Sequence, residues 1–363
     1  MEISKMKKKS FHTFEEKKEK EINAAIDLFS SNSKFYNFIQ KLNEKPWKIF
    51  YKGLLPKKIK KIIDKQADFY QQEYVEQCWD KIIGEYFKLK ENEGKTPIDD
   101  IISKKKIDNQ KIIWQYWGTG WENKELPDIV KLCMKSLEKY KGDYTIIRLD
   151  DNNLKKYIDL PQFILEKKKN GKIPFAFFSD LLRLSLLKCY GGVWLDATIL
   201  LTDFLPKKYE NMDYFMFQRS INVKNKKYWE KMNNDYFSWN EKHKINVLNS
   251  IIFSKKENKV IKTILDLLLI FWEKKEKVPH YFFFQILYDK LINKHMTNIK
   301  CEIIDDTLPH ILFSKWNDKF NEKEYIEITK NINMHKLTYK LVNEKNCKKN
   351  SFYDYFINIY RST

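Results

Sequence analysis

PFAFFSDLLRLSLLKCYGGVWLDATILL, residues Pro174–Leu201, is the stretch of sequence that decides the fold. Its first half is a long apolar run that predicts a buried helix, and the polar side chains near its start are Ser179, Asp180 and Arg183. Gly191 and Gly192 end the predicted helix, because glycine readily adopts the left-handed backbone conformation of a helix end. Val193–Leu195 then predicts a short strand with Asp196 at its carboxyl end, which is where ligands bind in open α/β sheets.

Two further charged residues lie behind this strand end. Asp180 and Arg183 are three positions apart, so on a helix they share a face and can contact each other. The stretch therefore predicts a ligand-binding edge with one acid, a second buried acid and an arginine behind it. A buried Asp–Arg pair can also be purely structural, and the residues alone leave that alternative open.

The same residues carry a resemblance to a known family. The pattern S-D-x-x-R, an apolar helix, Y-G-G, an apolar strand and then D-x-D or D-A-T occurs here at Ser179–Arg183, Tyr190–Gly192 and Asp196–Thr198. It resembles the sugar-nucleotide core of the capsular polysaccharide synthesis proteins, relatives of glycosyltransferase family 32 and, more distantly, of the clostridial glucosylating toxins. A lone D-x-D is a weak signal, but the whole run at this spacing is specific.

The segment before this stretch predicts the start of a parallel sheet. Lys111–Trp117 is a strand-like apolar run, Leu126–Tyr140 reads as a helix, and Tyr144–Leu149 reads as a second strand. Strand, helix and strand in this order are typical of a βαβ unit. The resemblance adds that the fold is of the α/β, Rossmann-like type called GT-A, over residues 106–363. Residues 1–105 are expected to be an added helical and basic N-terminal region.

The resemblance also implies how the nucleotide and the sugar are bound. Gln115 and Trp117 are expected beside the base and ribose, although a tryptophan there could equally be a core aromatic. Asp180, Arg183 and Ser179 are expected to bind the donor sugar. Asn249 is a weaker candidate for the sugar and acceptor pocket, and its alternative is a helix N-cap or turn residue.

Sugar transfer needs positive charge at a leaving diphosphate, which a Mg²⁺ or Mn²⁺ ion often supplies. The resemblance implies Asp196 as the main metal carboxylate and Thr198 as a second metal ligand. Thr198 stands where the family often has a second Asp, and its hydroxyl can ligate the metal but lacks the charge of a carboxylate. His335 or Asp203 is expected to complete the metal site. Two phosphate-binding lysines are expected from the terminal H-K-L-T-Y-K motif, Lys336 and Lys340. The alternative for that motif is a basic surface turn.

Composition restricts the partners and the compartment. The 363 residues carry a formal net charge of +19, which suggests an anionic partner such as nucleotide phosphates, nucleic acid or an acidic membrane surface. The alternative explanation of the charge is that the genome favours lysine codons, so that Lys occurs on every solvent-exposed face. Five cysteines without metal-ligand spacing indicate neither a zinc site nor a disulfide framework. With no apolar signal core and no membrane-spanning run, we expect a cytoplasmic protein or one that is peripheral on the inner face of the cell membrane.

One N-terminal segment suggests such a membrane contact. WKIFYKGLLPKKIKKIIDK, residues Trp47–Lys65, interleaves basic and aromatic residues in a way that suits an anionic lipid surface. Its alternative is an ordinary amphipathic helix that packs on the catalytic domain.

Together these features predict a glycosyltransferase, and the resemblance implies that it is a hexosyltransferase. It would move a sugar from a nucleotide-sugar donor, a UDP-sugar used with retention, to a saccharide or lipid-linked saccharide in capsular or other surface polysaccharide synthesis. A toxin-like protein glycosyltransferase is one alternative. A basic nucleic-acid-binding protein is another, but the lysines are dispersed and no nucleic-acid-binding motif occurs, so no nucleic-acid partner is expected.

Overall fold

A five-stranded mixed sheet forms the centre of the molecule, as the computed structural model shows for residues 17, 19–91, 94–108, 111–122, 126–339 and 348–361. Its strands are β2 (Ile112–Tyr116), β3 (Thr145–Leu149), β5 (Gly192–Leu195), β7 (Tyr214–Gln218) and β8 (Val247–Ser254). The spatial order is β3-β2-β5-β8-β7, in which β2 runs parallel to both β3 and β5, and β8 runs antiparallel to both β5 and β7. The predicted α/β class and the parallel βαβ opening are confirmed.

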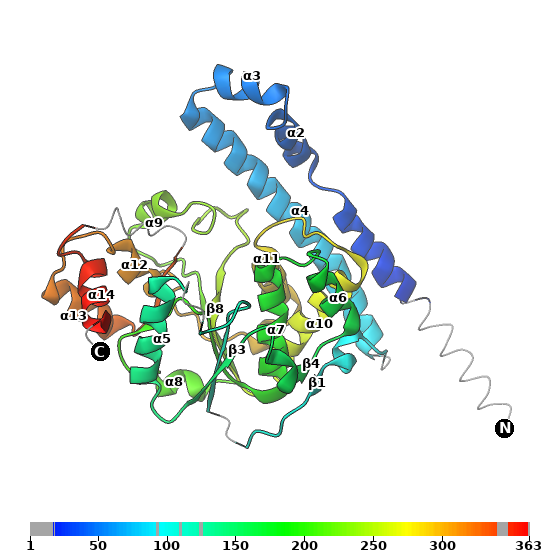
Figure 1. Cartoon of the computed structure of the whole chain (residues 1–363). Coiled ribbons are helices and arrows are strands. Elements are labelled where there is room, and N and C mark those ends of the chain that lie inside the picture. Colours follow the sequence, from blue (N-terminus) through cyan, green and yellow to red (C-terminus); the bar gives the residue numbers. More distant parts are fainter. Residues whose placement is uncertain are drawn as a thin grey trace, which may run out of the picture.

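Helices cover both sides of this sheet (Figure 1). One side carries α6 (Gln162–Lys169), α7 (Phe175–Tyr190), α10 (Lys259–Lys274) and α11 (Phe283–Lys290), and the other carries α5 (Asp128–Tyr140). Sheets with helices on both faces bury both sides of their strands, so their strands read as continuous apolar runs. All five residues of β2 and of β7 are buried accordingly.

Two tryptophans anchor the parallel pair of strands at the centre. Trp114 of β2 lies opposite Trp194 of β5, and both side chains are almost fully buried. Each indole N–H still finds an acceptor: Trp114 donates to the carbonyl of Gly191 (2.9 Å) and Trp194 donates to Asp196 Oδ1 (2.8 Å). Because buried indoles need such partners, the core packing itself helps to orient Asp196.

The two glycines at the junction of α7 and β5 have the role that the sequence predicts. Gly191 and Gly192 have φ values of +70° and +94°, a region that disfavours residues with a side chain. A Cβ on Gly192 would lie 2.5 Å from the carbonyl oxygen of Ile112, so the close approach of β2 and β5 also requires glycine. The helix can therefore turn directly into the central strand.

A second, smaller hydrophobic cluster completes the C-terminal part. It packs α5 against α12 (Ile311–Ser314), α13 (Glu322–Asn331) and α14 (Phe352–Arg361). Between the two clusters lies a two-stranded antiparallel sheet of β6 (Ile199–Leu201) and β9 (Met334–Lys336). Other short elements are β1 (Ile102–Ser103) paired with β4 (Ile158–Asp159), α8 (Lys207–Glu210) and α9 (Lys226–Met232).

The described residues of the N-terminal region are mostly helical. It contains a helix over residues 19–27, followed by α2 (Lys34–Leu42), α3 (Trp47–Leu54) and α4 (Lys57–Glu91). α4 has 35 residues, so it is about 50 Å long, and its first half projects from the body together with α2 and α3 (Figure 1). We call residues 34–64 the arm.

The second half of α4 belongs to the same hydrophobic core as the sheet. Trp79 and Ile82 are fully buried in that core, and Asp266 of α10 accepts hydrogen bonds from Tyr86 Oη (3.1 Å) and from the backbone N–H of Ile98 (3.2 Å). The described residues on the two sides of the boundary expected at residues 105/106 therefore share one core.

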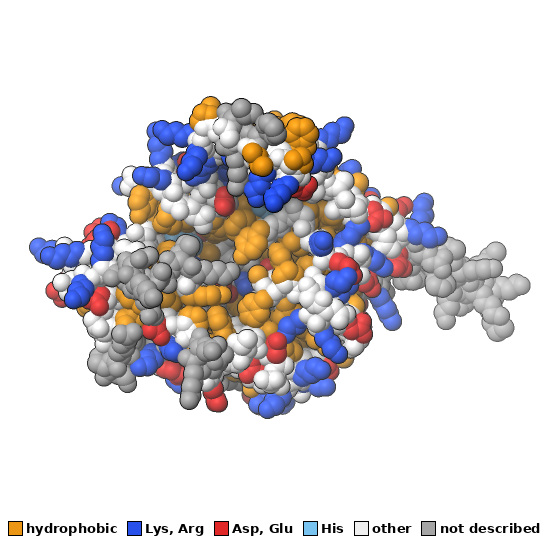
Figure 2. Space-filling model, turned by 45° about the horizontal axis from the view of Figure 1, so that its top comes forward, with side chains coloured by type: hydrophobic (Ala, Val, Ile, Leu, Met, Phe, Trp, Pro, Cys, Tyr) orange, Lys and Arg blue, Asp and Glu red, His pale blue; other side chains and the backbone are white. Residues whose placement is uncertain are grey.

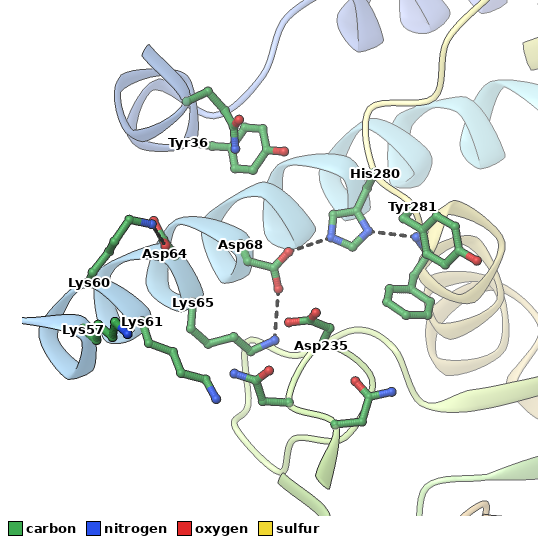
Figure 3. A pocket seen from close by; sticks show the side chains of 14 residues that line it. Tyr36, Lys57, Lys60, Lys61, Asp64, Lys65, Asp68, Asp235, His280 and Tyr281 are labelled. Carbon is green, nitrogen blue, oxygen red and sulfur yellow. Dashed lines mark hydrogen bonds and ion pairs between the residues drawn. The ribbon is translucent and has the colours of Figure 1, made fainter. Parts of the chain in front are cut away.

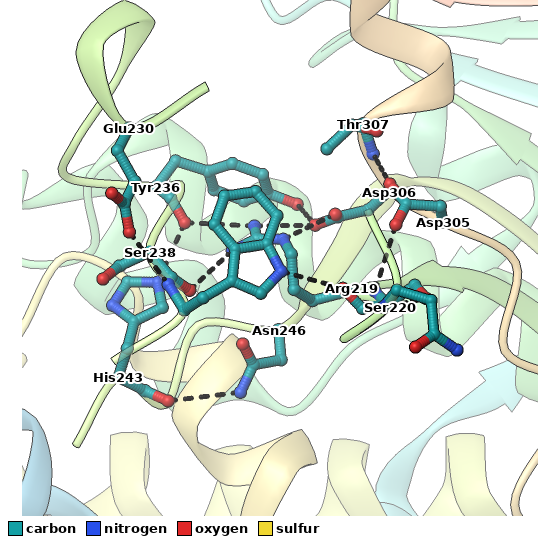
Figure 4. Close-up of polar contacts among 12 residues, drawn as sticks. Arg219, Ser220, Glu230, Tyr236, Ser238, His243, Asn246, Asp305, Asp306 and Thr307 are labelled. Carbon is teal, nitrogen blue, oxygen red and sulfur yellow. Dashed lines mark hydrogen bonds and ion pairs between the residues drawn. The ribbon is translucent and has the colours of Figure 1, made fainter. Parts of the chain in front are cut away.

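A buried ion pair fixes the loop beyond β7 (Figure 4). Arg219 donates to both carboxylate oxygens of Asp306, at 2.7 and 2.9 Å, and its other N–H groups reach the carbonyls of Tyr236 and Ser238. Tyr236 Oη also donates to Asp306 (2.9 Å). This network joins segments 236–238 and 305–307 to Arg219, directly after β7.

Candidate active site

The predicted site residues gather where the strand order changes direction. From β2 the chain crosses to β3 on one side of β2 and then returns to β5 on the other side, so the carboxyl ends of β2 and β5 form a topological switch point. Trp117 follows β2 and Asp196 follows β5 directly. The predicted position of Asp196 at the carboxyl end of a strand is confirmed.

Four charged side chains form a connected cluster at this edge. Asp196 lies between two cations: its Oδ1 is 3.3 Å from Arg183 Nη2 and its Oδ2 is 3.2 Å from Lys336 Nζ. Arg183 Nη2 is also 3.4 Å from Asp180 Oδ1. The structure therefore brings together residues from α7, β5 and β9, including a pair that is 140 positions apart in the sequence.

Arg183 is held in place by its surroundings. Its Nε donates to the carbonyl of Ser179 (3.2 Å), its Nη2 donates to Ser179 Oγ (3.3 Å), and its Nη1 donates to the carbonyl of Asn249. The guanidinium also lies over the ring of Trp194, 5.1 Å from the centroid. Ser179 thus contacts the arginine, and the arginine can change position little when a ligand binds.

Asn249 joins the cluster through Asp180. It lies inside β8, and its Nδ2 donates to Asp180 Oδ1 at 2.9 Å. The alternative reading of Asn249 as a helix N-cap or turn residue is wrong, because Asn249 lies inside β8. Asn258 caps α10 instead, by accepting from the N–H groups of Val260 and Ile261.

The two carboxyl groups have different electrostatic surroundings. Burial raises the pKa of Asp180 to about 6, and the nearby charge of Asp196 adds to this effect while Arg183 opposes it. Burial also raises the pKa of Asp196, but the charges of Arg183 and Lys336 more than offset this and hold that pKa below its usual value. Asp196 therefore carries the fixed negative charge of the cluster, and Asp180 can exchange a proton near neutral pH.

Lys336 reaches the cluster because of the strand register. Lys336 of β9 pairs with Ile199 of β6, and the backbone N–H of Leu337 donates to the carbonyl of Thr198 (3.0 Å). The ammonium of Lys336 then lies 2.8 Å from Thr198 Oγ1 as well as beside Asp196. Lys336 and Thr198 are therefore both at the site.

His335 lies on the opposite face of the same strand, because neighbouring residues of a strand alternate in direction. Its imidazole is fully buried, its Nε2 is 3.0 Å from Thr202 Oγ1, and burial lowers its pKa to about 3. The structure does not bring His335 to Asp196. Asp203 is also apart from the cluster: it is exposed, and its carboxylate accepts from the backbone N–H of Phe204. Lys340 lies outside the described residues.

The donor set does not fit a resident divalent cation. Asp196 Oδ2 and Thr198 Oγ1 both contact the ammonium of Lys336, so a metal ion bound to these two oxygens would lie against a positive charge. Among the described residues no group of three or more His, Cys, Asp and Glu side chains could hold a metal ion.

Aromatic rings surround Trp117 at the end of β2. Its ring centroid lies 5.5 Å from that of Tyr339 and 6.5 Å from those of Trp121 and Phe175. These rings are partly exposed, as a surface for stacking a nucleotide base requires. Sequence reasoning missed the three partners, although the repeated Trp in W-G-T-G-W and the Tyr of the terminal motif could have indicated them.

Gln115 lies elsewhere. It is fully buried within β2, where its Oε1 accepts from Arg148 Nε (3.2 Å), and its Nε2 has no hydrogen-bond partner in the structure. Its side chain has no surface for contact with a nucleotide, so it does not join Trp117 at the strand end.

Parts of the chain are similar to known proteins. Segments of about a hundred residues are similar to two fungal enzymes: the O-glycosyltransferase PaGT of Phomopsis amygdali (30% identity, 27% of this chain and 26% of the relative) and the O-glycosyltransferase braB of Annulohypoxylon truncatum (27% identity, 25% and 23%). The chain thus spans about a quarter of the length of these curated relatives. A solved structure, the PaToxG glycosyltransferase, aligns over 72% of this chain and 95% of its own at 16% identity, with a TM-score of 0.31.

The family assignment rests on a much longer match. The family model of the capsular polysaccharide synthesis proteins matches residues 57–356, which include the sheet, the charged cluster and all of α4. The chain belongs to the capsular polysaccharide synthesis protein family.

Proposed function

We propose that the protein is a glycosyltransferase that moves a sugar from a nucleotide-sugar donor to a saccharide acceptor. The observation that carries this proposal is Asp196, held between Arg183 and Lys336 at the carboxyl end of β5 and beside the partly exposed rings around Trp117. Cations suit the diphosphate of the donor, carboxylates suit sugar hydroxyls, and aromatic rings suit the base. We also propose, on the basis of the family membership, a GT-A arrangement, a UDP-sugar donor, retention of the anomeric configuration and a role in surface polysaccharide synthesis.

The residues have separate roles in the reaction. The bond between the anomeric carbon and the diphosphate oxygen breaks, and its electron pair goes to the diphosphate. The acceptor hydroxyl oxygen bonds to the anomeric carbon, and its proton passes to the departing diphosphate. Arg183 and Lys336 stabilise the growing negative charge, whereas Asp180 and Asp196 hold the sugar hydroxyls in the orientation that the reaction needs.

A pocket of about 740 Å³ is our candidate for the acceptor site (Figure 3). It lies between the arm and the body and is lined by the side chains of α2 and α4 on one side and by segments 233–235 and 280–282 on the other. Its lining combines aromatic rings, amides, acids and lysines, a mixture that suits a saccharide with a charged substituent such as a phosphate. Tyr281 connects the pocket to α7, the helix that carries Asp180 and Arg183, because its ring lies 6.1 Å from that of Phe177 in the first turn of α7.

The arm suits the surface of an anionic membrane. Residues 34–64 contain nine lysines and two acids. Exposed apolar side chains lie among these lysines: Phe38, Trp47, Ile49, Ile59 and Ile62. Figure 2 shows such apolar and basic side chains beside one another at the end of the arm. Apolar groups that enter the headgroup region and lysines that meet anionic lipids are the two components of peripheral membrane binding. No helix in the described part of the chain has both the length and the apolar character to span a bilayer.

The arm and the pocket together favour a lipid-linked saccharide as the acceptor. Lys57 and Lys61 line the pocket at the end of α4 that belongs to the arm. A membrane-bound arm would place this end close to the lipid headgroups, where the phosphate of a lipid-linked acceptor lies.

Turnover of nucleotide sugars tests the proposed function. Purified full-length protein is screened with a panel of UDP-, GDP- and other nucleotide sugars for hydrolysis and for transfer to saccharides. Asp196→Asn should abolish both reactions and leave the far-ultraviolet circular dichroism unchanged, while Asp213→Asn, on a side chain that is 79% exposed, should behave like the wild type. Normal turnover by Asp196→Asn would contradict the assignment of the site.

Vesicle binding tests the membrane contact. The protein should bind phosphatidylserine-containing vesicles, and binding should fall with added salt because the charges are screened. Ile49→Ser should weaken this binding, whereas Ile221→Ser, at an equally exposed position on the body, should not. Equal binding to neutral vesicles, or equal effects of the two variants, would contradict the proposed role of the arm.

A further inference from the structure

The ammonium of Lys336 occupies the position between the two side chains that the family pattern assigns to a metal ion. It lies 3.2 Å from Asp196 Oδ2 and 2.8 Å from Thr198 Oγ1. This position is part of the fold, because the β6–β9 pairing and the backbone hydrogen bond from Leu337 to Thr198 hold Lys336 there.

The other oxygen of Asp196 is also in use. Asp196 Oδ1 accepts from Trp194 Nε1 at 2.8 Å and lies 3.3 Å from Arg183 Nη2. Both carboxylate oxygens therefore face a donor of the protein. A divalent ion that coordinated either oxygen would lie close to a guanidinium or to an ammonium, and like charges at such separations repel each other strongly in a partly buried site.

The residue at position 198 is consistent with a lysine in place of a metal ion. An Asp at this position would give the site a second carboxylate. A divalent ion requires this additional negative charge more than the single positive charge of a lysine does. Thr198 instead offers a neutral hydroxyl that accepts from Lys336. One carboxylate, one hydroxyl and one ammonium make a set that is complete without a metal ion. About a quarter of the Lys336 side chain remains exposed, so its remaining N–H group can reach a ligand.

We propose that Lys336 replaces the divalent cation in this protein and binds the diphosphate of the donor and of the departing nucleotide without metal, while the buried Arg183 adds a second positive charge beside it. The inference rests on the proposed function. When the bond between the anomeric carbon and the diphosphate breaks, the electron pair and the negative charge move to the diphosphate oxygen. Lys336 donates a hydrogen bond to that oxygen, and this contact strengthens as the charge grows.

Calorimetric titration of the full-length protein with UDP and with inorganic pyrophosphate in excess EDTA tests the inference. We expect binding in EDTA, with a Kd that added Mn²⁺ changes less than about twofold. Lys336→Met should weaken the binding about 10- to 100-fold, the usual effect of losing a charge-assisted hydrogen bond. Lys336→Arg should retain most of the affinity, and Lys323→Met, on the exposed side of α13, should leave it unchanged.

A metal titration gives a second readout that does not depend on activity. Electron paramagnetic resonance of Mn²⁺ should show no bound ion on the wild-type protein. Lys336→Asp should bind Mn²⁺, because it removes the ammonium and adds a carboxylate beside Asp196 and Thr198.

The outcomes separate this inference from the proposed function. A wild-type protein that binds Mn²⁺ at this site, or that binds UDP and transfers sugar only when Mn²⁺ is present, overturns the inference and leaves the glycosyltransferase function standing. A protein that binds no nucleoside diphosphate and transfers no sugar under either condition refutes both. If Lys336→Met does not fold, Lys336→Arg and the wild-type titrations still decide the question.

Discussion

Replacing Asp180 by asparagine is expected to stabilise the folded protein at neutral pH, although it removes a group of the candidate active site. Burial raises the pKa of Asp180 from 3.8 to about 6, with Asp196 adding to this shift and Arg183 opposing it. Because the folded state then binds the proton more tightly than the unfolded state, the free energy of unfolding falls as the pH rises from about 4 to about 6. Above this window the wild-type protein carries the whole destabilising effect of a buried charge.

The size of the effect follows from that shift. About two pKa units correspond to about 3 kcal/mol, at about 1.4 kcal/mol per unit. Asparagine has nearly the shape of aspartate, and its side-chain oxygen can still accept the hydrogen bond from Asn249 Nδ2. The attraction to Arg183 is already contained in the shift. We therefore expect Asp180→Asn to raise the free energy of unfolding by about 1 to 3 kcal/mol at about pH 7.5.

Urea unfolding of both proteins between about pH 4 and pH 8 measures this difference. The difference should be small at about pH 4 and reach a plateau above about pH 6. The buried residues His243, His310 and His335, whose pKa values burial lowers to about 3, affect both proteins alike and cancel in the comparison. Asp213→Asn serves as the exposed control. A variant that is less stable than the wild type at about pH 7.5, or a difference that is constant with pH, would refute the reasoning.

Three further substitutions test structural roles of buried residues by thermal unfolding. Arg219→Met leaves Asp306 buried without its counter-ion and should lower the free energy of unfolding by about 3 to 5 kcal/mol; a loss below about 1 kcal/mol would contradict a structural role for this pair. Gly192→Ala forces a Cβ against the backbone of β2 at a φ of +94° and should cost about 1 to 3 kcal/mol, and wild-type stability would show that the glycine is not required. His335→Ala removes a buried ring and should lower the free energy of unfolding by about 2 to 4 kcal/mol. Unchanged stability together with a changed response to Mn²⁺ would instead indicate that His335 binds a metal ion.

The sequence determined those parts of the molecule that depend on near neighbours along the chain. The apolar run of α7, the two glycines and the strand that delivers Asp196 are readable because helix ends and buried strands have local signatures. The pairing of Asp180 with Arg183 is readable for the same reason, since residues three apart meet on a helix. The motif order within this stretch also determined the family.

The tertiary structure decided which distant residues complete the site. Lys336 and Asn249 reach Asp196 and Asp180 from β9 and β8, and nothing in their local sequence shows these contacts. His335 and Lys336 are adjacent in a motif that favoured both, but a strand sends neighbouring side chains to opposite faces, and a one-residue change of register would exchange them. The pairing of β9 with β6 places Lys336 at Asp196 and buries His335 in the core, so the packing of the sheet decided that this site contains an ammonium and not an imidazole.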